Sequence, residues 1–417
     1  MRVLFVGHSP HLAGAEYSLL RLIQHMPKTV EISVLAPANG LFEKSIKELG
    51  HDFYPLTLNY AFYLKKDNQA NFGKFLKTLS ESVDSLSNTL PVVDVVHSNT
   101  FFIWEGALLA AKWCVPHVWN LREIIMDSPT WSPLLNFDDQ FQLMDTFTDH
   151  FVCVSRALAT KCPESTSQKS VVHNGFTMTE GKTREESRFY FESQFGIPMN
   201  AKIVLTTGNF IPEKGHDWML EVADAVLDKF NDVYFLWVGS HDFSYPEIEK
   251  KMRNIRSSNR IICPGHVNGF NQYFKGVDVY ALCSETEAFP TTLLEAQYNK
   301  VPIVARDCGG AKEIIDLGEQ GKVLGLYDQK GFILALENTL NNLNTPLENS
   351  FYFTMDKMVE AYVSIYEKAI ESYQINPARN VYLSLFLRNG DKFLAPSPIL
   401  PSLKVQIKLK IKKILGL

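Results

Sequence analysis

The sequence lacks several features that would narrow its class at once. No apolar run approaches the ~18 residues that a membrane-spanning helix needs. The six cysteines include no C-x-x-C pair, which favours buried free thiols in a reducing compartment. The formal net charge of −5 gives no electrostatic support for a nucleic-acid partner.

The composition, 46% hydrophobic and 21% charged, is typical of a soluble globular protein. A length of 417 residues predicts two domains. The opening apolar run at 1–7 is too short for a signal peptide and indicates a first strand. We therefore expect a cytoplasmic protein.

Strand patterns alternate with helical patterns in two successive sets. The first set of strands is predicted at 2–7, 31–35, 92–97, 117–120 and 151–154, and the second at 202–208, 233–239, 260–263, 277–282, 301–305 and 322–324. Two such βαβ arrays predict an α/β protein with two doubly wound, Rossmann-like domains that face each other across a cleft.

The expected domain boundaries follow from these arrays. The first domain spans 1–176 and the second 201–350, and the charged, irregular stretch 177–200 between them is predicted to be a linker. An amphipathic helix at about 353–372 is expected to pack back on the first domain. Residues 373–417 form a basic C-terminal extension.

This extension carries five lysines between 404 and 413, alternating with apolar residues and without an acid. The alternation suits an edge strand or a solvated tail. The same lysines could hold the protein on an anionic membrane surface. Both interpretations stay open.

Polar residues follow two strands of the first domain, where the carboxyl ends of parallel strands form ligand sites. His97, Asn99, Arg122 and Glu123 are therefore expected at a cleft edge. Gly14 lies in the loop after the first strand, where it either serves a tight turn or lets the backbone approach a phosphate.

The stretch 283–295 carries the most chemistry. Pro290 favours the start of a helix, so Glu287 is predicted in the preceding loop and Glu295 inside the helix. The free N–H groups of about 289–293 would attract a phosphate. Carboxylates beside a phosphate site suit hydroxyl groups, which predicts a ligand with both phosphates and sugar hydroxyls.

A second loop enters a helix after Gly208. It brings Lys214 beside the opening N–H groups, where the ammonium is either a point charge for phosphate or a solvated surface group.

Together these motifs resemble the retaining glycosyltransferases of family 4, the glycosyl transferases group 1, which have the GT-B fold. The E-x7-E element from Glu287 to Glu295 carries most of the resemblance, and the loop 208–215 resembles the family's G-R-x-x-x-x-K-G. Weaker matches are the glycine loop at Gly14 and Val172-x-Asn174-Gly175. The matches lie in the family's order over roughly residues 1–370.

The resemblance implies a nucleotide-sugar donor held mainly by the second domain. Glu295 would bind the ribose and Glu287 the hydroxyls of the transferred sugar. Lys214 would bind the diphosphate together with the backbone of Phe289, Pro290, Thr291, Thr292 and Leu293. Gly14 would let the first-domain loop approach the donor.

The implied activity is retaining, hexosyltransferase-type transfer (EC 2.4) to a glycan or a lipid-linked glycan. It would serve cell-surface polysaccharide or glycolipid biosynthesis, in the cytoplasm or at the inner face of the cytoplasmic membrane. The chain contains no D-x-D triplet, so no metal or other cofactor is expected to be obligatory.

Two departures from the family pattern leave alternatives open. Asn209 stands where the family has an arginine, and Arg122 is a candidate replacement cation. The family's first-domain His-Asp is absent, which makes His97 the substitute candidate for a catalytic histidine. A nucleotide-sugar epimerase and a non-catalytic partner subunit remain the competing hypotheses.

Overall fold

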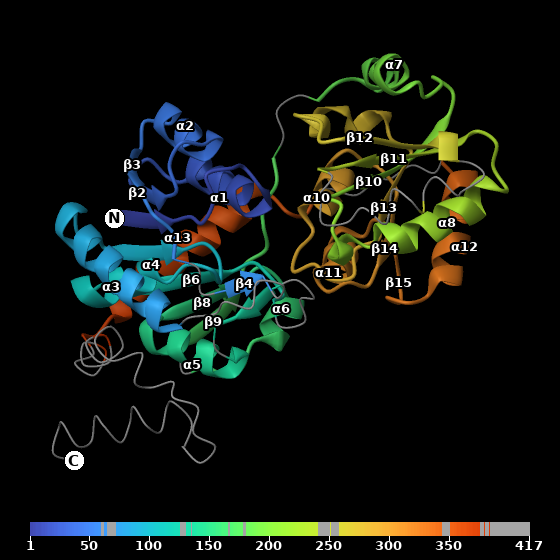
Figure 1. Ribbon diagram of the computed structural model, residues 1–417. Helices are drawn as coiled ribbons and strands as arrows, with labels where there is room; N and C mark the ends of the chain where they lie inside the picture. The colour runs from blue at the N-terminus through green and yellow to red at the C-terminus, as the bar shows by residue number, and fades with distance from the viewer. Residues whose placement is uncertain are drawn as a thin grey trace, which may run out of the picture. The chain divides into compact units, whose positions relative to one another are not determined.

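The computed structural model divides the chain into two compact units (Figure 1). Unit 1 contains Met1–Gly175 and the chain from Met355 onward, and unit 2 contains Phe176–Thr354. The structure describes residues 1–59, 62–64, 72–125, 131–134, 136–165, 167–177, 181–240, 251, 258–343, 351–375, 379 and 383.

Unit 1 is built on a seven-stranded parallel sheet in the order β3-β2-β1-β5-β6-β8-β9. Its strands are β1 (Arg2–Val6), β2 (Glu31–Ala36), β3 (Asp52–Pro55), β5 (Val95–Ser98), β6 (His117–Leu121), β8 (His150–Cys153) and β9 (Gln168–Val171). A small antiparallel pair, β4 (Phe62–Leu64) and β7 (Trp131–Pro133), lies outside this sheet. The order reverses between β1 and β5, which creates the switch point where doubly wound sheets bind ligands.

Helices cover both faces of this sheet. The helices are α1 (Gly14–His25), α2 (Leu41–Glu48), α3 (Phe72–Thr89), α4 (Glu105–Trp113), α5 (Phe137–Phe147), α6 (Arg156–Lys161) and α13 (Met355–Ser372). Val3 and Phe5 of β1 join α1 and α13 in one buried apolar cluster. On the opposite face α4 lies so close that a Cβ at Gly106 would meet Val6 at 3.0 Å. The C-terminal helix α13 therefore completes unit 1.

Unit 2 repeats the plan with a six-stranded parallel sheet in the order β12-β11-β10-β13-β14-β15. The strands are β10 (Lys202–Thr207), β11 (Val233–Val238), β12 (Ile261–Gly265), β13 (Val279–Leu282), β14 (Ile303–Arg306) and β15 (Lys322–Leu324). The helices are α7 (Arg184–Phe195), α8 (His216–Leu227), α10 (Thr291–Tyr298), α11 (Gly310–Gly318) and α12 (Gln329–Asn341), with short 3-10 turns η2 (Pro212–Lys214), η3 (Ser258–Arg260) and η4 (Phe270–Gly276).

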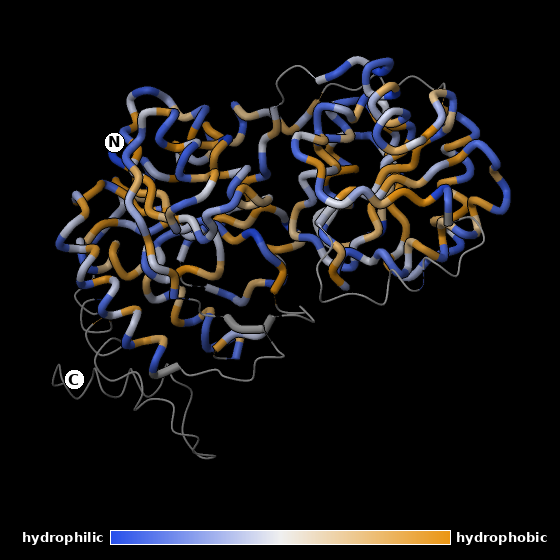
Figure 2. Tube along the Cα trace, turned by 45° about the horizontal axis from the view of Figure 1, so that its top comes forward, coloured by the Kyte–Doolittle hydropathy of each residue, from blue (hydrophilic) through white to orange (hydrophobic). Residues whose placement is uncertain are grey.

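The strands form the apolar interior of each unit, as the hydropathy colouring of Figure 2 shows. In unit 2, α8 and α12 share one buried cluster with β10, β11 and β13. This agrees with the predicted pattern, because strands covered on both faces are near-continuous apolar runs. Within the described part of the chain, no helix combines the length and apolarity needed to cross a membrane.

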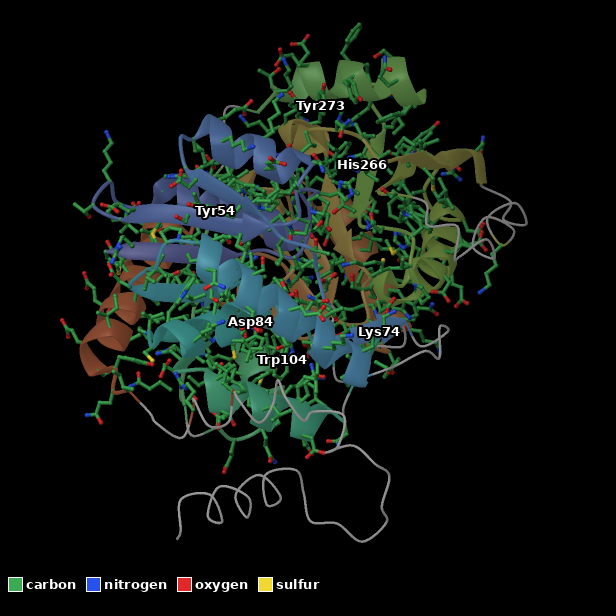
Figure 3. The ribbon with its side chains drawn as sticks, turned by 60° about the vertical axis from the view of Figure 1, so that its left-hand side comes forward. Tyr54, Lys74, Asp84, Trp104, His266 and Tyr273 are labelled. Atoms are coloured by element: carbon green, nitrogen blue, oxygen red, sulfur yellow. The ribbon has the colours of Figure 1, made fainter. Side chains whose placement is uncertain are left out.

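The prediction of an irregular linker at 177–200 is wrong for the twelve residues of α7. Thr183 and Glu186 form a capping box at its start, which satisfies two backbone donors. The charges that suggested a loop are used in packing, since Arg184 and Arg188 both pair with Asp278. The helix also stacks on η4, where the rings of Tyr190 and Tyr273 lie 4.0 Å apart. Tyr273 is labelled in Figure 3.

The six cysteines are free, and four of them are buried, as expected; Cys114 and Cys263 are partly exposed. The lysine-rich stretch 404–413 lies outside the described residues.

Candidate functional site

In unit 2, two loops meet where β10 and β13 end. The first runs from Gly208 to Gly215 and the second from Cys283 to Glu287. Gly215 has a left-handed backbone (φ 64°), and a Cβ there would lie 2.2 Å from the carbonyl oxygen of Cys283. The Cys283 thiol also donates to the Lys214 carbonyl at 3.1 Å. Glycine at 215 is therefore required for the two loops to approach each other.

This approach brings Lys214 to Glu287. The Lys214 Nζ lies 2.5 Å from Glu287 Oε1, which also accepts a hydrogen bond from the Ser284 hydroxyl at 2.9 Å. The two charged side chains are 27% and 18% exposed, so a ligand can reach them. Burial alone would lower the pKa of Lys214, but the charge of Glu287 and its hydrogen bond outweigh burial and raise that pKa. Lys214 is therefore a cation, as a phosphate contact requires.

The following helix starts close to the predicted position. Pro290 is the N-cap of α10, and, as predicted, Glu287 lies in the preceding loop and Glu295 lies inside the helix. The Glu295 side chain is partly exposed. The Glu287 backbone is fixed by hydrogen bonds to the neighbouring loop, from its N–H to the Cys308 carbonyl and from the Gly310 N–H to its own carbonyl. The two acids thus stand on rigid backbone.

The backbone donors are fewer than the sequence suggested. Pro290 has no N–H, and the Leu293 N–H donates to the Pro290 carbonyl at 3.0 Å, so neither serves as a donor to a ligand. The Phe289 ring is buried against Phe353. Within the described residues, the N–H groups of Thr291 and Thr292 make no hydrogen bond. These two N–H groups of the helix start can bind an anion, and the role of the Phe289 backbone stays a prediction.

The side chain of Asn209 is exposed. Its Oδ1 accepts one long hydrogen bond, at 3.4 Å, from the backbone nitrogen of Ser240.

A cation that the sequence pattern did not indicate lies beside these loops. Arg306 is buried and donates to the carbonyls of Cys283 and Leu326, each at 2.7 Å. Arg306 therefore positions the loop after β13, and its only sequence signal is an arginine at the end of an apolar strand.

In unit 1, polar residues gather at the carboxyl ends of β5 and β6. Arg122 is buried and donates to the side-chain oxygens of Asn99 at 2.8 Å and Asn174 at 2.7 Å. Glu123 lies next to it, and burial raises its pKa to about 7, against the opposing charges of His8 and Arg122. Arg122 is thus held by two amide oxygens of its own unit, and its role as a replacement phosphate cation stays a prediction.

The prediction that His97 lies at a cleft edge is wrong. Its ring is fully buried, and its Nδ1 lies 2.7 Å from the Tyr366 hydroxyl of α13. β5 continues to Ser98, so His97 is inside the strand and, like its register partner Phe5, faces the α13 side. Burial lowers the pKa of His97 to about 3, with a further contribution from the charge of Arg122. Its position excludes it as a ligand-contacting catalytic histidine.

Gly14 is the first residue of α1, and a Cβ there would meet no atom within 4 Å. Its φ lies outside the left-handed region. The tight-turn explanation is therefore wrong, and the open space leaves the approach to a ligand as the remaining prediction.

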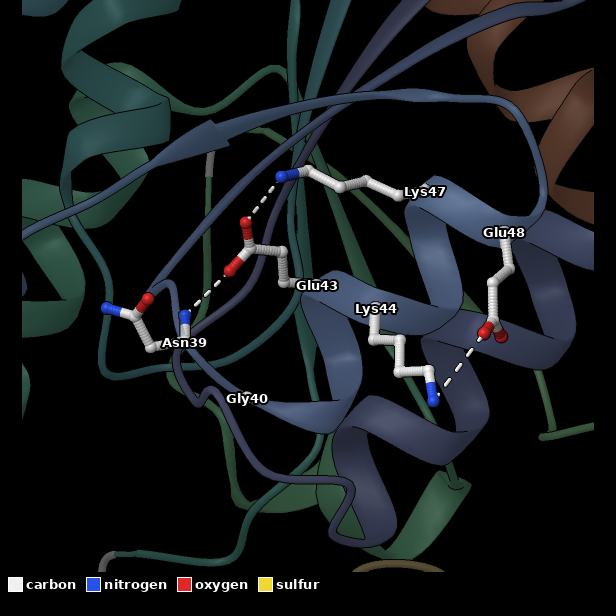
Figure 4. A pocket seen from close by; sticks show the side chains of 6 residues that line it. All are labelled: Asn39, Gly40, Glu43, Lys44, Lys47 and Glu48. Atoms are coloured by element: carbon white, nitrogen blue, oxygen red, sulfur yellow. Dashed lines mark hydrogen bonds and ion pairs between the residues drawn. The ribbon is translucent and has the colours of Figure 1, made fainter.

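A separate hollow of about 470 Å³ lies beside α2 in unit 1 (Figure 4). It is lined by Asn39, Gly40, Glu43, Lys44, Lys47 and Glu48. Its two lysines pair with its two glutamates, Lys47 with Glu43 at 2.6 Å and Lys44 with Glu48 at 3.8 Å. With its charges paired in this way, the hollow has no net attraction for a phosphate.

Two doubly wound parallel sheets, each with helices on both faces, define the GT-B fold, and the predicted fold class is confirmed. Anabaena HepE, solved in complex with UDP and glucose, superposes with a TM-score of 0.66 at 19% identity over 88% of this chain and 99% of HepE.

Residues 201–342, which contain the paired loops and α10, match the family Glycosyl transferases group 1. Among curated relatives, the Rhizobium meliloti lipopolysaccharide core biosynthesis glycosyltransferase LpsE is 23% identical over 52% of this chain and 64% of LpsE. The Bacillus anthracis N-acetyl-alpha-D-glucosaminyl L-malate synthase is 26% identical over 43% of this chain and 51% of that enzyme. The matched segments thus span about half to two thirds of these two relatives.

Proposed function

We propose that this protein is a glycosyltransferase that moves a sugar from a nucleotide-sugar donor to a glycan or lipid-linked glycan, with retention of anomeric configuration. The observation that carries this proposal is the Lys214–Glu287 pair beside the start of α10, because it combines a cation, a carboxylate and free N–H groups at one sheet edge. The match of residues 201–342 to Glycosyl transferases group 1 supports it.

In the proposed complex, the donor diphosphate binds Lys214 and the N–H groups of Thr291 and Thr292. Glu287 then accepts hydrogen bonds from hydroxyls of the transferred sugar, and Glu295 accepts those of the ribose. Lys214 and the helix start stabilise the charge that develops on the leaving diphosphate, so no obligatory metal is proposed. Since Ser284 and the backbone fix Glu287, it orients the sugar without rearrangement of its loop.

The proposed pathway is the synthesis of a cell-surface polysaccharide or glycolipid. Relatives such as LpsE and the Streptococcus pneumoniae alpha-galactosylglucosyldiacylglycerol synthase support this choice. We also propose that the protein works in the cytoplasm, and at the inner face of the cytoplasmic membrane when the acceptor is lipid-linked.

A panel of nucleotide sugars, screened by thermal unfolding, tests the proposal. A ligand that binds the native state raises the melting temperature by mass action. We expect at least one nucleotide sugar to raise it and the same donor to label a glycan or lipid-linked acceptor. A donor that is converted without any acceptor would favour the epimerase instead, and binding without either reaction would favour a non-catalytic subunit.

A further inference from the structure

A buried tyrosine of unit 2 lies beside the start of α10. Tyr280 belongs to β13, is fully buried and packs on the Phe274 ring of η4, with ring centroids 5.9 Å apart. Its register partner on β10 is Leu205, so Thr207, two residues further along β10, lies on the same face of the sheet. The hydroxyl oxygens of Tyr280 and Thr207 are 2.8 Å apart. The tyrosine hydroxyl is therefore anchored at the carboxyl end of β10.

The same hydroxyl reaches α10. It forms a hydrogen bond with the side chain of Thr292, the second residue of that helix. Burial and the charge of Glu295 raise the pKa of Tyr280, against the opposing effect of its contacts with the two threonines, so the phenol keeps its proton. A neutral tyrosine hydroxyl both donates and accepts, which lets it join two threonine hydroxyls. Tyr280 thus links the end of β10 to the first turn of α10.

This link replaces a capping side chain. Helices commonly begin with Ser, Thr, Asp or Asn, whose side chain accepts a hydrogen bond from one of the first N–H groups. The N-cap of α10 is Pro290, which makes no such bond, and within the described residues the N–H groups of Thr291 and Thr292 are unbonded. Tyr280 holds the first turn through the Thr292 side chain, so it fixes the turn without using the backbone donors.

We propose that Tyr280 is a positioning residue of the donor site, which acts through Thr292 to hold the first turn of α10 where its N–H groups bind the diphosphate. This inference rests on the proposed nucleotide-sugar site. Groups that are fixed before the ligand arrives lose less conformational entropy on binding, which strengthens the complex. Removal of the Tyr280 hydroxyl should therefore weaken diphosphate binding, although the hydroxyl itself does not touch the ligand.

The test measures the calorimetric Kd of UDP, ADP and GDP for Tyr280→Phe, which keeps the ring and deletes the hydroxyl. The Kd of the diphosphate that binds the wild type most tightly should rise about 3- to 10-fold, the equivalent of one neutral hydrogen bond. Thr207→Val removes the other anchor of this hydroxyl and should also raise the Kd. It takes the place of Tyr280→Phe if that variant does not fold.

Thr206→Val is the matched control. The Thr206 hydroxyl is also buried between β10 and β13, where it donates to the Ala281 carbonyl at 2.9 Å. Thr206 lies on the opposite face of the sheet from Thr207. Its substitution should lower the melting temperature, because a buried hydrogen bond is lost, and leave the Kd within about 1.5-fold of the wild type. A purely structural role of Tyr280 would give this same result in Tyr280→Phe.

A double variant tests whether Tyr280 acts through Thr292. Thr292→Val keeps the backbone N–H and removes the hydroxyl that Tyr280 holds. If the two residues act as one unit, Tyr280→Phe combined with Thr292→Val should bind the diphosphate within about 1.5-fold of Thr292→Val alone. Independent contributions would instead multiply.

The outcomes separate the two proposals. If the wild type binds a nucleoside diphosphate and Tyr280→Phe, or Thr207→Val in its place, binds it equally well, the positioning role is refuted and the donor site stands. The same holds if the two losses multiply in the double variant. If the wild type binds none of the three diphosphates and no nucleotide sugar of the panel, the donor site itself fails, and the role of Tyr280 with it.

Discussion

Substitutions at Lys214 and at Glu287, which form an ion pair, should affect the binding of a nucleoside diphosphate differently. In the free protein Lys214 Nζ bonds to Glu287, and a donor diphosphate must replace Glu287 as the partner of Lys214. A hydrogen bond between charged groups contributes about 1.5–3 kcal/mol. Lys214→Met should therefore raise the Kd of a nucleoside diphosphate about 10- to 150-fold.

Glu287→Gln should not weaken the binding of the same ligand, because a nucleoside diphosphate lacks the transferred sugar that Glu287 is proposed to hold. The substitution removes the competitor for Lys214, and a partly exposed pair is worth at most about 1 kcal/mol, so the Kd should be unchanged or fall up to about fivefold. Sugar transfer should nevertheless slow at least about tenfold, because an amide accepts weaker hydrogen bonds than a carboxylate.

Titration calorimetry with UDP, ADP and GDP measures both changes in Kd. Lys229→Met is the matched control, since Lys229 pairs with Glu337 at 2.7 Å elsewhere in unit 2. Wild-type affinity in Lys214→Met would refute the phosphate role. A loss in Glu287→Gln as large as that in Lys214→Met would refute the division of labour between the two residues.

Three further predictions concern Asn209 and Gly215 of unit 2 and Glu123 of unit 1. Asn209→Arg should tighten nucleoside diphosphate binding about tenfold, because it adds a charge-assisted contact of about 1.5 kcal/mol; calorimetric affinity equal to the wild type would count against a phosphate near Asn209. Gly215→Ala should lower the free energy of unfolding by at least about 1 kcal/mol, since its Cβ would lie 2.2 Å from the Cys283 carbonyl at φ 64°; urea unfolding checks this, and unchanged stability would show that the loops can separate freely. Glu123 has a pKa raised to about 7, so the native state binds its proton more tightly than the unfolded state, and its contribution to stability is lost as pH rises from about 4.5 to 7. Between those pH values Glu123→Gln should gain stability relative to the wild type. If the free energies of urea unfolding of the variant and the wild type change in parallel with pH, the raised pKa of Glu123 is wrong.

Much of the fold follows from local patterns. Parallel strands buried on both faces form apolar runs, which is why β1, β2, β6 and β10 start where they were expected. The start of α10 was predicted because Pro290 suits a helix N-terminus. The placement of Glu287 before the helix and Glu295 inside it followed directly.

Tertiary contacts decided the features that the sequence pattern missed. His97 is polar and was expected at the end of its strand, but β5 continues to Ser98. The side chain of His97 is therefore buried against Tyr366 of α13. The charges before 190 suggested a loop, yet Asp278, about 90 residues away, pairs with Arg188 and helps to hold α7. The link from Tyr280 to Thr207 and Thr292 likewise depends on how α10 packs on the sheet.

The binding of the nucleotide sugar to Glu295→Ala tests the central claim most directly. Glu295 is proposed to hold two ribose hydroxyls, so its loss should raise the calorimetric Kd of the donor identified by thermal screening at least about 100-fold. Glu337→Ala, on another helix of unit 2, should bind as the wild type. A Glu295→Ala variant that folds and binds the donor with unchanged affinity would contradict the assignment of this site.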